Sequence, residues 1–266
     1  MIINTNFASL SAQRNLATNS EKLSTSVQRL SSGLRINSAK DDAAGLVISE
    51  GLRAQIRATN VAVRNAQAGI SMAQTAEGAM QEVGNMLGRM KELAEQAASG
   101  TTDDNGRIAL DAEYQALLTE IGRITTTSNF NGVELLTAGV VDIQVGPAST
   151  DTVSFTLPDA ATLVTSASNL LTTGTSQAVL DTLDADIIAV AGARGDLGAV
   201  QNTLESTIAN LRITSENLSA AESVIRDTDF AFETSQFTKN QILVQAGTAM
   251  VAQANVLPQA ALQLLK

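Results

Sequence analysis

The fold is decided by residues 183–232, which read LDADIIAVAGARGDLGAVQNTLESTIANLRITSENLSAAESVIRDTDFAF. An apolar residue recurs there every seven positions without a miss. A straight helix drifts by about 20° per heptad, so a strict repeat indicates a helix that supercoils against partner helices. We call its first seven positions the rod seam: Leu183, Val190, Leu197, Leu204, Leu211, Leu218 and Ile225. A companion series, also spaced by seven residues and including Ala193 and Thr207, is small or polar. This indicates a weak seam, so the helix is expected to pack against more than one neighbouring helix.

The N-terminal half is also predicted to be helical. Its first proline is Pro147, so nothing before it obliges a helix to break. Apolar residues spaced by three or four predict helices over about 43–98 and 105–127, and the seam predicts a third over about 178–228. An earlier stripe of the same kind consists of Leu23, Val27, Leu30 and Leu34.

The heptad register changes after Phe232. A second series appears at Phe230, Phe237, Val244 and Val251, so the apolar face moves around the helix near residues 226–233. We therefore expect residues 230–266 to form a separate terminal helix, interrupted only by Pro258.

The middle of the chain has a different pattern. Residues 140–157, VVDIQVGPASTDTVSFTL, alternate β-formers around a turn and predict a small β-hairpin region over about 130–158. Residues 149–176 contain 13 Ser or Thr among 28 positions, which predicts a solvated tip.

These patterns together predict a mainly α protein, a long antiparallel helical coiled-coil hairpin. The expected domains are an inner domain of paired terminal helices, residues 1–42 plus 230–266, and a rod domain, residues 43–229. Apolar stripes at both termini lack covering partners within such a chain. Uncovered apolar surface of this kind predicts assembly.

Composition excludes several classes of protein. The chain has no His and no Cys, the residues that most often serve as metal ligands and in nucleophile–base pairs, so we expect neither an enzyme nor a cofactor or metal site. The net charge is −10, and no Lys or Arg lies between Arg123 and Arg194, which argues against nucleic acid as a partner. The sequence contains no run of 18 apolar residues, so no membrane span is predicted. Its first residues, MIINTNFASL, do not have the pattern of a cleaved secretory signal.

Several motifs resemble one protein family. They are LSSGLRINSAKDDAAG (30–45), GISMAQTAEGAM (69–80), FNGVELL (130–136), IQVG (143–146), NLSAAESVIRDTDFAFE (217–233) and QILVQAGTAMVAQANVLPQAALQLLK (241–266). In this order they resemble the bacterial flagellins over roughly residues 1–146 and 178–266.

The resemblance implies a structural subunit that polymerises with copies of itself into the extracellular flagellar filament, which serves motility. It also implies type III export without a cleaved signal, an export chaperone, and hook–filament junction and cap proteins as partners. The short central region leaves no room for a large outer domain. In the inner layer, Leu23, Val27, Leu30 and Leu34 are expected to pack with Phe237, Val244 and Val251.

A flagellin-sensing Toll-like receptor is a further partner that the resemblance implies. The family's recognised patch maps onto Arg89, Leu93 and Glu113. The alternative is that Arg89 and Glu113 form an ion pair between adjacent helices.

Two other functions compete with the filament subunit. A hook–filament junction protein shares the terminal helices, but it usually carries longer central domains. A cell-surface adhesive homologue of flagellin would use the acidic tip as its contact.

Overall fold

The structure is a computed structural model, and it describes residues 5–166 and 168–263, with side chains up to residue 256. The chain divides into two compact units. We call Met1–Ala54 with Asn217–Lys266 the terminal unit, and Gln55–Glu216 the central unit. The terminal unit is longer than the expected inner domain, because it takes in the first turns of one long helix and the last turns of another.

The described residues are mostly helical, as the sequence predicts. The helices are α1 (Phe7–Ser32), α2 (Ala43–Ala98), α3 (Asp104–Thr127), α4 (Ala160–Leu163), α5 (Thr173–Arg226) and α6 (Phe230–Gln263). The strands are β1 (Asn129–Phe130), β2 (Val133–Glu134), β3 (Gly139–Gln144) and β4 (Thr152–Leu157), in two separate antiparallel pairs.

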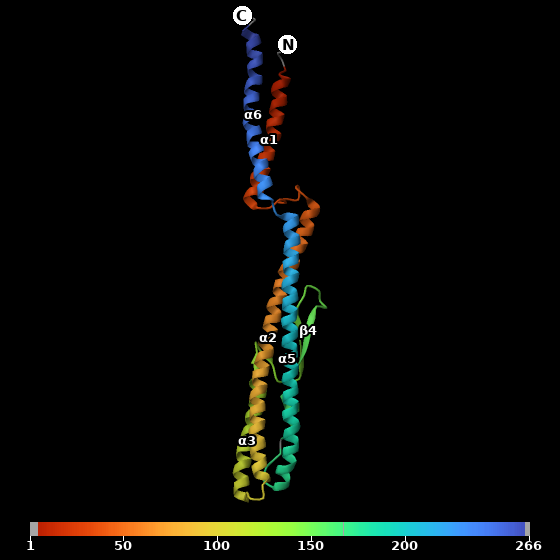
Figure 1. The fold of residues 1–266 in the computed structure, drawn as a ribbon, viewed down its shortest axis with the longest axis vertical. Helices are drawn as coiled ribbons and strands as arrows, with labels where there is room; N and C mark the ends of the chain where they lie inside the picture. The colour runs from red at the N-terminus through yellow and green to blue at the C-terminus, as the bar shows by residue number, and fades with distance from the viewer. Residues whose placement is uncertain (1–4, 167, 264–266) are drawn as a thin grey trace. The chain divides into compact units, whose positions relative to one another are not determined.

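In the terminal unit, α1 and α6 lie side by side and antiparallel (Figure 1). The side chain of Asn6 caps the start of α1 by accepting a hydrogen bond from the backbone N–H of Ser9. Gly33 ends α1 in the left-handed conformation, with φ of 73°, which a residue without Cβ adopts at little cost.

The segments that follow α1 and α5 are paired with each other. An antiparallel bridge joins Leu34 to Asp227, and the N–H of Arg35 donates to the carbonyl of Arg226 at 2.7 Å. The N–H of Thr228 donates to the carbonyl of Gly33 at 2.9 Å. The two connections of the terminal unit are therefore held together by backbone hydrogen bonds.

The central unit is a helical bundle in which α2, α3 and α5 run side by side (Figure 1). One hydrophobic cluster joins α2 residues such as Leu87 to Tyr114 of α3 and Leu197 of α5. Its α2 part consists mainly of Ala, Met and Leu, as expected where helix axes approach closely. Asp103 caps α3 by accepting from the N–H of Gly106 at 2.9 Å.

The β3–β4 hairpin is anchored on α2. Ile143 of β3 is buried and occupies the notch left by Gly69 on α2, beside Leu204 of α5. The side-chain amide of Asn65 donates to the carbonyl of Gln144 at 3.1 Å.

A second, shorter hairpin differs from the single one that the sequence predicts. β1 and β2 are joined by Asn131 and Gly132, which both have positive φ, 50° and 84°. This geometry is typical of a two-residue type I′ turn, for which Asn-Gly is the favoured pair.

The Ser/Thr-rich segment is not a solvated tip throughout. Asp186 of α5 is buried and accepts hydrogen bonds from the backbone N–H and hydroxyl groups of both Thr165 and Ser166. Asp111 of α3 accepts from the N–H of Leu170 at 2.8 Å. The prediction was wrong here because a buried carboxylate supplies partners for polar groups that would otherwise need water.

Pro258 was expected to interrupt the terminal helix, but α6 continues through it to Gln263. The loss of one backbone hydrogen bond does not end this helix.

Tyr114 allows a test of the packing around this segment. Its hydroxyl donates to the carbonyl of Ser166 at 2.7 Å, and burial raises its pKa to about 12. The pKa in the folded state lies above the unfolded value of about 10, so the neutral Tyr114 hydroxyl contributes to the free energy of unfolding, and this contribution is fully present below pH 10. It is lost as the pH rises through 12. Because the chain has one Tyr and no Trp, absorbance near 295 nm reports this group alone. We expect titration near 12 in the folded chain, and a folded-chain value near 10 would contradict the packing.

Two glycines of α2 test the hairpin anchor as a matched pair. A Cβ on Gly69 would overlap Cδ1 of Ile143, whereas one on Gly84 would lie 3.7 Å from Cγ1 of Val190, an ordinary contact. We expect Gly84→Ala to stabilise the helix by about 0.5–1 kcal/mol. Gly69→Ala is expected to cost about 1–2 kcal/mol net, because overpacking exceeds that gain. Thermal melts followed by circular dichroism measure both, and equal shifts would show that Ile143 does not occupy the notch.

Candidate functional site: the paired terminal helices

The surface between α1 and α6, which we call the terminal pair, has an unusually polar interior. Buried polar side chains there are Ser9 and Ser26 of α1, with Glu233 and Asn240 of α6. They alternate along the contact with half-buried apolar residues such as Leu16. Polar residues at such seam positions specify register at a cost in stability.

Specific polar contacts fix the antiparallel register of the terminal pair. The side-chain amide of Asn6 donates to the carbonyl of Ala254 at 2.8 Å, and the hydroxyl of Ser9 donates to Oδ1 of Asn255 at 2.8 Å. At the other end, Arg29 and the buried Glu233 form an ion pair at 3.6 Å. The polar contacts therefore lie at both ends of the contact.

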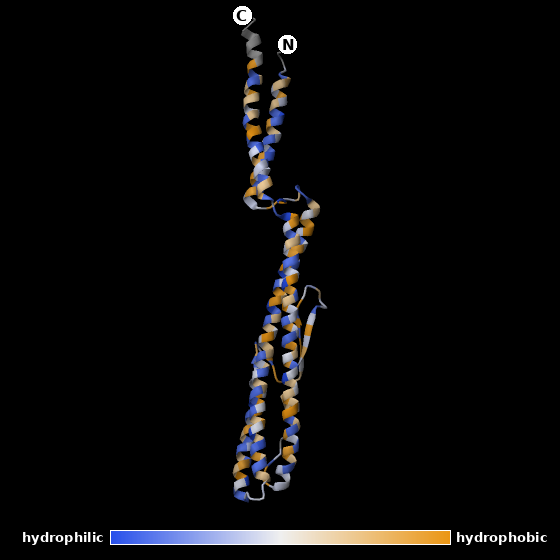
Figure 2. Cartoon of the chain, viewed as in Figure 1, coloured by the Kyte–Doolittle hydropathy of each residue, from blue (hydrophilic) through white to orange (hydrophobic). Residues whose placement is uncertain are grey.

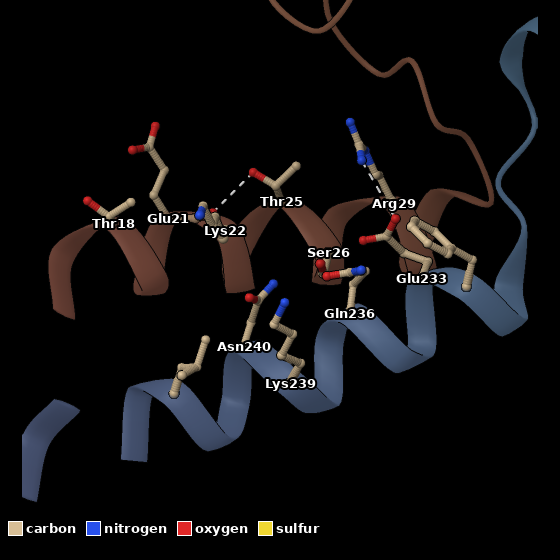
Figure 3. Close-up of a pocket in the computed structure, with 12 residues that line it drawn as sticks. Thr18, Glu21, Lys22, Thr25, Ser26, Arg29, Glu233, Gln236, Lys239 and Asn240 are labelled. Carbon is tan, nitrogen blue, oxygen red and sulfur yellow. Dashed lines mark hydrogen bonds and ion pairs between the residues drawn. The ribbon is translucent and has the colours of Figure 1, made fainter. Parts of the chain in front are cut away.

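A shallow groove of about 540 Å³ runs beside this ion pair (Figure 3). Its α1 side is polar, with Thr18, Lys22 and Thr25 among the lining residues, and Gln236 and Lys239 come from α6. Nε of Arg29 is buried without a hydrogen-bond partner among the described residues. One buried hydrogen-bond donor beside the groove therefore has no acceptor within the described part of the chain.

The outer surface of the terminal pair carries large exposed apolar side chains, where polar side chains would be expected on a protein that stays monomeric. Hydrophobic residues occur along α6 and are not confined to the side that faces α1 (Figure 2). Phe232 is 62 % exposed and Met250 is 61 % exposed, and Ile242 lies between them. On α1, Phe7 and Leu10 are similarly exposed. A surface of this kind marks a site of protein association.

The structure places the expected inner-layer residues in two groups. Most are half-buried in the terminal unit: Leu23, Leu30, Leu34, Phe237, Val244 and Val251. Val27 is different, because 48 % of its surface is exposed to solvent.

The rod seam is buried unevenly. Leu183, Val190, Leu197 and Leu204 are buried in the core of the central unit. Leu211, Leu218 and Ile225 are half-buried, and the last two belong to the terminal unit. The sequence repeat is uniform, whereas the burial is not.

The expected receptor patch is only partly a surface. Arg89 donates to the Glu113 carboxylate at 2.9 Å and to Glu92 at 2.8 Å, and the Arg89 and Glu113 side chains are about half exposed. Leu93 is 1 % exposed, so its expected place on a contact surface was wrong. Leu93 belongs to the hydrophobic cluster that joins α2 with α3 and α5.

Sequence reasoning missed part of the pairing surface of α1. Ser9, Leu16, Leu23 and Leu30 lie seven residues apart, and Ser26 lies on the same face. Ser9 and Ser26 were missed because the sequence was searched for apolar residues alone.

Two carboxylates hold the connections of the terminal unit in place. The backbone N–H and hydroxyl of Ser38, with the N–H of Asn37, hydrogen-bond Asp41 and lower the pKa of its carboxyl. The hydrogen bond from Arg226 at 2.7 Å lowers the pKa of Glu50.

These lowered pKa values predict acid sensitivity of the connection between α1 and α2. A folded-state pKa below the unfolded value means that the stability is present above the ordinary carboxyl range of about 4 and is lost as the pH falls below it. We expect the protection factors for hydrogen exchange at residues 33–42, corrected for the intrinsic exchange rate at each pH, to fall about threefold between pH 5 and pH 3, a small change because both groups are exposed. Asp41→Asn should show the faster exchange already at pH 7. An unchanged exchange rate in Asp41→Asn would contradict this role.

These features define a class of protein: a helical subunit whose termini expose an apolar surface to other chains. No helix among the described residues is long and apolar enough to cross a membrane. Within the same residues, no group of three or more His, Cys, Asp or Glu is placed to hold a metal ion.

Comparison with known proteins gives the family. The bacterial flagellin N-terminal helical region matches residues 3–141, and the bacterial flagellin C-terminal helical region matches residues 180–265. Flagellin of Halalkalibacterium halodurans is 47 % identical over 272 residues, and flagellin of Bacillus subtilis is 41 % identical over 304 residues, with all of each chain covered. The crystal structure of Bacillus cereus flagellin is 32 % identical, with a TM-score of 0.53 over 60 % of this chain and 94 % of that one.

The chain belongs to the bacterial flagellin family. It is a structural subunit of the flagellar filament, which is extracellular, and it has the mainly α flagellin fold without a large outer domain. A flagellar hook-associated protein of Vibrio parahaemolyticus shares the fold with a TM-score of 0.61 at 15 % identity, which concerns fold alone.

Proposed function

We propose that the chain polymerises by burying the exposed apolar surface of its terminal pair against other copies. The observation that supports this is the inverted arrangement of the pair, with buried Glu233 and Asn240 and exposed Phe232 and Met250. Burying one such large apolar side chain contributes roughly 1.5–3 kcal/mol.

In this proposal the inner-layer residues have two roles. Leu23 and Leu30 of α1 pack with Phe237, Val244 and Val251 of α6 to hold the terminal pair together, and Leu34 lies in the connection that follows α1. Val27, which is exposed, contacts other copies. The rod seam, from Leu183 to Ile225, holds together the rod domain of residues 43–229, and the terminal helices form the inner domain of residues 1–42 plus 230–266.

The same surface supports the proposed partners. We propose that an export chaperone covers the apolar residues of α6 before assembly, and that cap and hook–filament junction proteins pair with the terminal helices at the filament ends. Export without a cleaved signal and a non-enzymatic role complete the proposal. For a flagellin-sensing Toll-like receptor, the contact would be carried by Arg89 and Glu113 rather than by the buried Leu93.

No observation on the described residues favours the two alternatives, a hook–filament junction protein and a cell-surface adhesive homologue. Relatives that match over their full length include flagellins and flagellar filament core proteins, and the likeness to a hook-associated protein concerns fold alone. Nothing in the geometry of the described residues of the middle segment, 149–166 and 168–176, points to adhesion.

Filament growth tests the proposal. Short filament fragments serve as seeds, and electron microscopy compares the full chain with a truncation that lacks residues 230–266. We expect growth from the full chain and none from the truncation. A full chain that stays monomeric in the presence of seeds would overturn the proposal.

Point variants refine this test. Phe232→Ser and Met250→Ser should each weaken subunit addition by about 1.5–3 kcal/mol, seen as a higher critical concentration. Ile108→Ser in α3 is the matched control, since Ile108 is also exposed but lies in the central unit. Equal effects from all three variants would assign the loss to general solubility rather than to the terminal pair.

A further inference from the structure

The outer side of α5 in the central unit is unexpectedly apolar. Ile188 lies five residues after Leu183, about 140° around the helix from the seam, and is 72 % exposed. Gly192 and Gly195 continue this side, and apart from the helix's own adjacent residues and nearby backbone no atom lies within 4 Å of the position that a Cβ would take on either. The helix backbone is therefore open to close approach by another chain.

This side of α5 is flanked by acidic groups. Asp181 and Asp196 are exposed and, among the described residues, neither forms an ion pair. The basic groups nearby are already engaged, because Lys91 pairs with Asp184 and Arg194 pairs with Glu77. We call Asp181, Ile188, Gly192, Gly195 and Asp196 the acidic face.

A second exposed surface has the opposite charge. Arg57 and Arg64 lie two helical turns apart on α2, and both are exposed without an ion pair within the described part of the chain. Between them, Val61 is 44 % exposed. We call Arg57, Val61 and Arg64 the basic face.

The two faces are complementary in charge but differ in span: at about 1.5 Å per residue, about 22 Å separates Asp181 from Asp196 and about 10 Å separates Arg57 from Arg64, so the long arginine side chains must reach outward. Each has an exposed aliphatic side chain between two like charges. Arginine at such a surface can pair with a carboxylate while its aliphatic part covers apolar surface.

The faces lie at different levels along the central unit. The ion pairs Lys91–Asp184 and Glu77–Arg194 place α5 residues 184–194 beside α2 residues 77–91. The basic face precedes this level of α2 by about 35 Å, at about 1.5 Å per residue. One chain cannot bring its own two faces together.

We propose that the acidic face of one copy binds the basic face of a second copy that is displaced by about 35 Å along the helix direction. Each copy then offers one face to the copy before it and the other to the copy after it. Contacts of this heterologous kind do not close on themselves, and they generate an open array. The inference rests on the proposed polymerisation and names a contact of the central unit, separate from the terminal pair.

Charge reversal tests the contact with the full chain. Arg57→Glu with Arg64→Glu reverses the basic face, and Asp181→Lys with Asp196→Lys reverses the acidic face. We expect each double variant to raise the critical concentration for seeded growth about tenfold, because attraction becomes repulsion at two positions. The defect should shrink at high salt, where exposed charges are screened. Growth like that of the unaltered chain would overturn the inference.

The combined variant decides whether the two faces are partners. Reversing all four residues restores complementarity, so we expect the critical concentration to return toward that of the unaltered chain. A matched control reverses the two arginines together with Glu134→Lys, which changes an exposed residue of β2 that belongs to neither face. This control should stay impaired. Failure of the four-residue variant to recover would show that the faces do not meet.

Two readouts keep the interpretation clear. The melting temperature and the titration of Tyr114 should be the same in all variants, which shows that the central unit is folded. If the unaltered chain elongates seeds and the reversed faces have no effect, this contact is wrong while polymerisation through the terminal pair stands. If the unaltered chain does not elongate seeds, the proposed polymerisation fails and this contact fails with it.

Discussion

The packing of α5 against α2 is the constraint on which the central unit depends. Leu183, Val190, Leu197 and Leu204 are buried in one cluster with the Ala- and Met-rich side of α2. A close-packed core of this kind tolerates little change in side-chain volume. The α3 helix, the β3–β4 hairpin and the segment around Ser166 are then added to that pair. Each addition has its own anchor: Tyr114 from α3, Ile143 in the Gly69 notch, and Asp186 beneath Thr165 and Ser166.

The terminal unit follows a different rule. Its two helices meet through half-buried leucine, valine and phenylalanine residues interspersed with serine, asparagine and an ion pair between Arg29 and the buried Glu233, and the polar contacts fix register more than they supply stability. The apolar residues that would stabilise a self-sufficient helix pair are exposed instead. Under the proposed polymerisation, such a subunit gains much of its stability from its neighbours, because association removes apolar surface from water. This division between a well-packed central unit and an incompletely covered terminal unit suits a protein of the flagellar filament.

Charge has a separate part from burial in this arrangement. The exposed arginines of α2 and the exposed aspartates of α5 lie on surfaces that the chain leaves open, and charged residues without partners contribute little to the fold of one copy. In the proposed contact their value lies in orientation and stagger, because complementary charges select one alignment among many apolar ones. The apolar terminal pair would then supply binding energy, while the charged faces would set the axial position of a copy.

The sequence by itself determined the helical class, the extents of the long helices and the hairpin, because heptad spacing, the late first proline and the alternation of β-formers are local signals. It also carried the family resemblance through motifs at both ends. Only the tertiary structure decided which positions of a uniform repeat are buried, since Leu197 and Leu218 have the same heptad position but different neighbours. It also placed Leu93 in the core and Ser166 over Asp186, because both depend on side chains that are distant in the sequence. Periodicity reports which residues share a face of a helix, whereas burial depends on what packs against that face.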